Sequence, residues 1–141
     1  MVLQVTVNYW AVLAAAVLSM VSGALWYSSF LFGKVWMKLS KFNPKDMAKA
    51  KKSGSVNKSY AIMFASSLVT AYVLSHFVDY VGATTVLGGV QLGFWLWLGV
   101  ATPIQLGMIL WEGKPVKLYL INTGYTLVNL ALVSAVLAMW A

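Results

Sequence analysis

The sequence contains no cysteine and no arginine, and it has one histidine and three carboxylates. Without cysteine, neither a disulfide nor a thiolate metal site can form. One histidine and three carboxylates are too few for the usual clustered metal or acid–base sites, so we predict a non-enzymatic protein without metal or cofactor. Charged residues make up 9% of the 141 residues and hydrophobic residues 61%. About a quarter of a soluble domain is charged, so the composition predicts a membrane protein instead.

Four apolar stretches are long enough to cross a bilayer, which requires about 20 residues each. They cover roughly residues 8–31, 60–79, 89–111 and 117–140. The sequence therefore predicts an all-α fold, a four-span transmembrane helical bundle that forms a single integral membrane domain over residues 1–141. The first 33 residues carry no lysine, unlike a signal peptide, so we expect the first span to be retained.

The lysines predict the orientation of the chain. All ten lie either between the first and second spans or between the third and fourth spans. The positive-inside rule therefore places both of these loops in the cytoplasm, and both termini on the non-cytoplasmic side of a cell's inner membrane.

The cytoplasmic segment 32–59 is rich in lysine. Lysines and apolar side chains separate to opposite faces over residues 34–42, which predicts an amphipathic helix lying in the membrane interface. Asn43, Pro44 and Gly54 supply start and stop signals for a second helix of about ten residues. The net charge of +7 does not favour nucleic-acid binding, because orientation in the membrane already explains it. We expect anionic lipid headgroups to contact Lys34, Lys38, Lys41, Lys45 and Trp36.

Near the outer surface, a phenol, an imidazole and a carboxylate follow one another on the second span. Tyr72, His76 and Asp79 are spaced i, i+4, i+7 and share one helix face, and Gln91 starts the third span nearby. Asp79 could orient His76 so that the imidazole takes up and releases a proton. The alternative is that His76 only makes a structural hydrogen bond near a helix end, and the sequence leaves both interpretations open.

A second polar set lies deeper in the bilayer, where polar groups need a partner or a function. Depth counted from the ends of the spans places Thr102 and Asn129 near the midplane, together with Ser19. These side chains could line a solute path or hold helices together by interhelical hydrogen bonds. The candidate intramembrane lining consists of Tyr27, Thr102, Gln105, Asn122, Tyr125 and Asn129.

Small residues and one proline predict the shape of the helices. Small residues recur every four positions from Ala11 to Gly23, at Gly89 and Gly93, and again from Gly99 to Gly107, so helices can approach closely there. Pro103 lacks an N–H group, which predicts a kink in the third span, with Thr102 or a neighbour bonding the freed carbonyl of Gly99.

Two motifs carry a resemblance to a known family. The run Gly23–Lys38 (GALWYSSFLFGKVWMK) and the later Trp111–Pro115 (WEGKP), with Gly124, Tyr125 and Trp140, resemble the small bacterial and archaeal membrane proteins grouped as domain of unknown function 1761. The resemblance implies a four-span integral membrane protein. It supplies no activity, substrate or catalytic residue.

Two functions from different classes remain at this point. The first is a non-catalytic structural or assembly subunit, forming a homo-oligomer or part of a larger membrane complex. The second is a small-solute or proton-linked transporter or channel. A water-filled cavity that reaches Asn129 and Gln105 at membrane depth would favour transport, whereas pairing of these side chains between helices would favour assembly.

Overall fold

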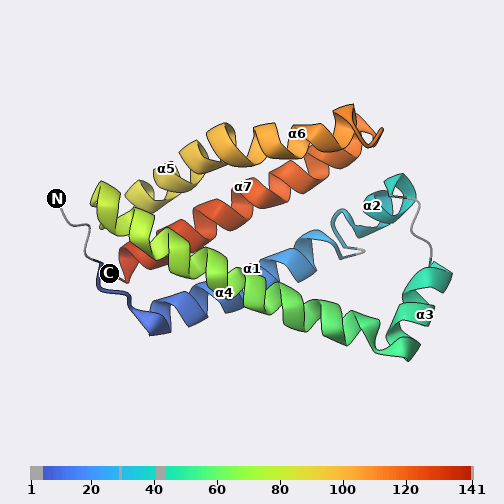
Figure 1. Cartoon of the computed structure of the whole chain (residues 1–141), viewed down its shortest axis with the longest axis horizontal. Coiled ribbons are helices and arrows are strands. Elements are labelled where there is room, and N and C mark those ends of the chain that lie inside the picture. Colours follow the sequence, from blue (N-terminus) through green and yellow to red (C-terminus); the bar gives the residue numbers. More distant parts are fainter. Residues whose placement is uncertain (1–4, 29, 41–43, 141) are drawn as a thin grey trace.

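The computed structural model describes residues 5–28, 30–40 and 44–140 of the chain (Figure 1). Within these ranges every regular element is a helix, and four spans are long and apolar enough to cross a membrane, namely α1, α4, the continuous α5–η1–α6 and α7. The predicted all-α class with four membrane spans is therefore confirmed. The elements are α1 (Tyr9–Trp26), α2 (Gly33–Leu39), α3 (Pro44–Ser53), α4 (Ser55–Val81), α5 (Val86–Leu96), η1 (Trp97–Ala101), α6 (Thr102–Leu110) and α7 (Val116–Met139).

The two ends of the bundle differ in charge. The α4–α5 turn lies at one end, where the Asn8 side chain donates a hydrogen bond of 3.1 Å to the backbone carbonyl of Trp140. At the other end lie α2, α3, the start of α4 and the turn between α6 and α7 (Figure 1). We call this the lysine end, because both lysine-bearing loops lie there. The expectation that the two loops share one flank fits this arrangement.

The first span ends earlier than the sequence predicts, at Trp26 rather than near residue 31. The chain then turns tightly, and the backbone N–H of Gly33 donates to the carbonyl of Ser28 at 2.8 Å. A Cβ atom at Gly33 would collide with the backbone carbonyl of Tyr27, so this turn requires glycine. Gly33 therefore begins α2 instead of ending α1.

The lysine-rich segment contains two short helices, as predicted, although α2 stops at Leu39. Helix α3 begins at Pro44 and runs for 10 residues to Ser53. Gly54 follows with φ of 76°, a conformation that glycine adopts without strain. The predicted N-cap, Asn43, lies outside the described residues.

Pro103 is accommodated by a π-helical turn, η1, that precedes it in the third span. In this turn the N–H of Thr102 bonds the carbonyl of Trp97, five residues earlier. In that register the carbonyl that Pro103 leaves without a donor is that of Leu98. The Thr102 hydroxyl donates to the Leu98 carbonyl at 2.8 Å. The expectation that Thr102 compensates for Pro103 is thus met, but at Leu98 rather than Gly99.

Helix α7 is the centre of the bundle and contacts α1, α4, α5 and α6. Its closest neighbour is α5, because two glycines of α5 allow the backbones to meet. A Cβ atom at Gly93 would lie 2.7 Å from the carbonyl oxygen of Leu130, and one at Gly89 would overlap the backbone of Ser134. The main apolar core joins α1, α4 and α7 away from the lysine end, through Ala11, Val12, Ala15, Ala71, Leu74, Val78, Val133, Leu137 and Ala138.

We predict that Gly93→Ala destabilises the protein, because the new methyl group meets the α7 backbone, which cannot move aside as a side chain could. Overpacking of this kind typically costs about 1–3 kcal/mol. Thermal melting in detergent should show a lower Tm. Gly99→Ala is the matched control, since a Cβ atom at Gly99 has nothing within 4 Å, and it should not lower the Tm. Equal effects of the two substitutions would contradict the α5–α7 packing.

Candidate functional site

The candidate site is built on α7, whose first half carries polar side chains in an otherwise aliphatic helix. Asn122, Tyr125, Thr126 and Asn129 follow each other at spacings of three or four residues, so they form one stripe along the helix. We call these four residues the polar stripe. All four are half-buried inside the protein. Hydrocarbon offers no hydrogen-bond partner, so neighbouring helices must supply them.

Helix α1 and the residue that follows it bond one side of the stripe. The Ser19 hydroxyl donates to Asn129 Oδ1 at 2.5 Å, and the Tyr27 hydroxyl donates to Asn122 Oδ1 at 2.7 Å. The Tyr125 hydroxyl donates to the backbone carbonyl of Ser19 at 2.9 Å. The absence of a side chain at Gly23 makes room for the Tyr125 phenol, since a Cβ atom there would lie 2.9 Å from its oxygen. Three residues of the stripe therefore bind α1 or its end.

Helix α6 bonds the opposite side of the stripe. Gln105 Nε2 donates to Thr126 Oγ1 at 3.1 Å, and Thr126 Oγ1 donates in turn to the backbone carbonyl of Asn122 at 3.0 Å. Asn122 Nδ2 also lies 4.0 Å from the sulfur of Met108. The stripe thus links the first, third and fourth spans in one network of hydrogen bonds.

Aromatic donors to backbone carbonyls extend this network, and the sequence did not reveal them. Trp26 Nε1 donates to the carbonyl of Ile121 at 3.0 Å, and Trp97 Nε1 donates to that of Thr123 at 2.7 Å. The Tyr119 hydroxyl donates to the carbonyl of Thr102 at 2.9 Å. Their spacing carries no signal of these contacts. Aromatic residues near span ends predict interfacial anchors, not indole bonds between helices.

One buried acceptor of the network has no partner among the described residues. The amide oxygen Oε1 of Gln105 is buried and unbonded, although its Nε2 is bonded to α7. The hydroxyl of Ser134 also has no hydrogen-bond partner among the described residues. Ser134 is 0% exposed and lies in the α5–α7 contact. A buried acceptor without a donor is costly, so Gln105 Oε1 is the point of the network able to receive a further hydrogen bond.

Of the residues proposed for proton exchange, the structure brings two together. His76 Nδ1 lies 2.9 Å from the carbonyl of Tyr72, one turn earlier, and the two rings meet edge to face with centroids 4.8 Å apart. A carbonyl only accepts, so Nδ1 carries the proton in this bond. Asp79 is exposed on the last turn of α4. His76 contacts Tyr72 and Tyr80, both on its own helix.

Gln91 lies apart from His76, in a shallow cavity of about 390 Å³ beside the α4–α5 turn. This cavity is open, and no residue of the polar stripe lines it. Its walls are formed by Val81, Gly82, Ala83, Thr84, Thr85, Gly88, Gln91, Leu92 and Trp95.

The described residues among those expected to meet lipid headgroups lie at the lysine end. The side chains of Lys34, Lys38 and Lys45 are exposed, and Lys41 lies outside the described residues. Trp36 is half-buried, with its ring 5.8 Å from that of Tyr27 in an edge-to-face contact. Trp36 therefore anchors α2 to the end of α1. Over the described part of the chain, no three His, Asp or Glu side chains come together to hold a metal ion.

The four long apolar helices define an integral membrane protein with four spans. The sequence model of the family described as "Protein of unknown function (DUF1761)" matches residues 10–138. The chain therefore belongs to this family, as its motifs indicate. Comparisons with curated proteins and with solved structures gave no match.

We predict that Ser19 and Asn129 stabilise the protein as a pair. In a double-mutant cycle with Ser19→Ala and Asn129→Ala, unfolding in mixed micelles should give a coupling energy of about 0.6–1.7 kcal/mol, the range of interhelical hydrogen bonds in membranes. Ser22 offers a control, because its hydroxyl bonds a carbonyl of its own helix. Ser22→Ala should show no coupling to Asn129→Ala. Additive effects in both cycles would refute the pairing.

Proposed function

We propose that the protein is a non-catalytic assembly subunit of the membrane, which associates with a second copy of itself through the third span. The polar network supports a structural role, because its side chains join helix to helix. The observation that carries the association is a small-residue stripe in the third span that the chain itself leaves open.

Two of the three small-residue stripes are used within the chain. Ala11, Ala15 and Ser19 of α1 are at most 5% exposed, and Gly89 and Gly93 touch the backbone of α7. Each of these small residues thus permits a contact inside the bundle. A glycine in a helix otherwise costs about 1 kcal/mol relative to alanine, so a contact normally accompanies it.

The Gly99 end of the third stripe has no such contact. A Cβ atom at Gly99 would have nothing within 4 Å, and Pro103 on the same stripe is exposed. Of the four spans, Val86–Leu110 has the smallest share of buried residues, 6% of its most apolar stretch. The π-helical turn η1 lies at this position, and such turns occur frequently at functional sites. A second helix could therefore approach closest at Gly99, because the missing side chain leaves a notch in the apolar surface there.

Small-solute or proton-linked transport is the second candidate, favoured by one observation. The unbonded Gln105 Oε1 could accept a hydrogen bond from a solute at membrane depth. Transport ranks second because Asn129, Asn122 and the nitrogen of Gln105 are bonded to other helices. A solute would have to break these bonds.

We predict that Gly99→Leu weakens self-association at least about tenfold, because the side chain fills the notch and a loss of about 1.4 kcal/mol already gives this factor. Energy transfer between two fluorescent copies, measured over a range of protein-to-lipid ratios, gives the dissociation constant. Ala65→Leu is the control, since Ala65 is exposed on the second span and its substitution should leave the constant unchanged. A wild-type protein that remains monomeric at all ratios would overturn the proposal.

A further inference from the structure

The inward face of α4 is buried at one end of the helix and open at the other. Helical spacing places on one face the residues Met63, Ser67, Ala71, Leu74 and Val78. Ala71 and Val78 are 0% and 2% exposed within the core, whereas Met63 is 54% exposed. Helix α4 therefore separates from the bundle toward the lysine end, as Figure 1 shows.

Among the described residues, no helix packs closely along this part of α4. Every residue of the segment 60–66 is exposed except Phe64, which is half-buried. Seven residues make nearly two turns, so a helix packed against the segment would bury a row of them. Lipid accounts for exposure on the outward face. Exposure on the inward face means that a space remains between α4 and the other helices.

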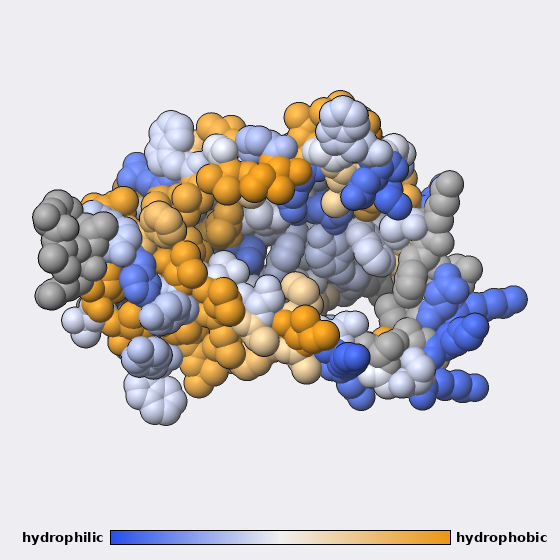
Figure 2. Space-filling view, in the orientation of Figure 1, coloured by the Kyte–Doolittle hydropathy of each residue, from blue (hydrophilic) through white to orange (hydrophobic). Residues whose placement is uncertain are grey.

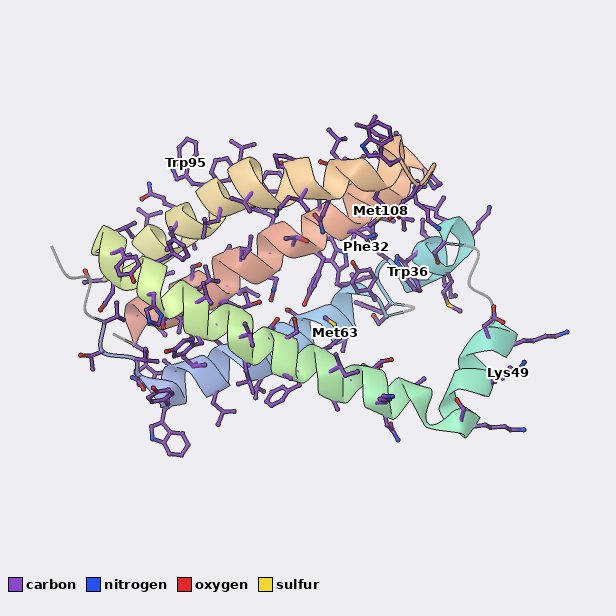
Figure 3. The ribbon with its side chains drawn as sticks, viewed as in Figure 1. Phe32, Trp36, Lys49, Met63, Trp95 and Met108 are labelled. Atoms are coloured by element: carbon purple, nitrogen blue, oxygen red, sulfur yellow. The ribbon has the colours of Figure 1, made fainter. Side chains whose placement is uncertain are left out.

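The opposite wall of this space is formed by α2, α6 and α7. Figure 3 shows Met63 on α4 and Met108 on α6 across this space, with Phe32 and Trp36 at its base. The ring of Phe32 is 4.7 Å from that of Trp26, so the base of the space is aromatic. Figure 2 shows the surface hollowed here. We call this space the lysine-end cleft, lined by Phe32, Trp36, Met63 and Met108.

The mouth of the cleft is positively charged. Exposed lysines come from each element that borders it: α2, the start of α4 and the turn into α7. Figure 2 shows hydrophilic side chains in blue on both of its borders. Glu112 brings a single negative charge to the α6–α7 turn. The exposed lysines are Lys34, Lys38, Lys58, Lys114 and Lys117.

We propose that the lysine-end cleft binds one anionic phospholipid, with an acyl chain between Met63 and Met108 and the phosphate among the lysines at the mouth. An apolar slot below a cationic rim matches the two parts of such a lipid. Methionine suits a flexible acyl chain because its thioether adapts its shape. This site lies on the inward face of α4 and is independent of the self-association through α5 and α6.

The unmodified protein provides the first test. Protein purified in mild detergent is incubated with equal amounts of phosphatidylglycerol and phosphatidylcholine, and native mass spectrometry counts the lipids that each chain retains. We expect a single retained lipid, with about a tenfold preference for phosphatidylglycerol. Retention of neither lipid, or of both equally, would overturn the proposal.

Matched variants locate the site. Met63→Trp should abolish retention because the indole fills the cleft. Ile62→Trp, at the same depth but on the outward face, where Ile62 is 59% exposed, should leave it unchanged. Equal loss in both variants would contradict an inward site.

The pair Lys114→Gln and Lys117→Gln should reduce the preference for phosphatidylglycerol. The charge-matched pair Lys49→Gln and Lys52→Gln on α3 should not, and an equal reduction would indicate a diffuse charge effect instead.

A helix from a second copy is the other occupant that the variants distinguish. Disulfide crosslinking between Met63→Cys chains in native membranes should give no dimer if a lipid fills the cleft. Efficient crosslinking at position 63 would show that protein fills it and would overturn the lipid site. Since the chain has no cysteine of its own, any crosslink must arise at this position.

Discussion

The polar side chains of the stripe on α7 need hydrogen-bond partners, and the hydrocarbon of the membrane supplies none. The rest of the structure depends on this constraint. Asn122 and Asn129 would each leave amide groups unbonded in hydrocarbon, which costs several kcal/mol per group. The hydroxyls of Tyr27 and Ser19 bond these two side chains, and Gln105 bonds Thr126 between them. A shift of α1 or α6 along α7 would break these bonds, so the stripe fixes the register of three helices.

Residue size sets how closely the helices approach and makes the two ends of the bundle different. Away from the lysine end, alanines of α1 and α4 and glycines of α5 let the backbones meet α7, and nearly all buried apolar residues lie there. Toward the lysine end, large aromatic residues such as Trp26 and Tyr27 fill the space around α7 and α4 moves away. Close packing thus holds one end, while the other remains open to lipid.

The sequence predicts the spans well because apolar length and lysine position are strong local signals. It also predicts the start of α3 at Pro44 and the compensation of Pro103 by Thr102. It could not predict the end of α1 at Trp26, since that turn depends on the close approach of Gly33 to the Tyr27 backbone. Depth alone places Ser19 and Asn129 in one layer, but which helices are neighbours depends on tertiary packing. The hydrogen-bond partner of His76 is the Tyr72 carbonyl, one turn earlier. The sequence could not predict this choice, because Asp79 lies about one turn away on the other side of His76.

The accessibility of position 129 to water tests most directly whether the polar stripe is a packed contact or a solute path. A single Asn129→Cys substitution in this cysteine-free chain can be treated, in sealed native membranes, with a membrane-impermeant thiol reagent from each side. A stripe that holds helices together predicts no labelling from either side, while a cysteine placed at the exposed Lys114 reacts fully from one side. Rapid labelling at position 129 would contradict the packed network and favour a water-filled path.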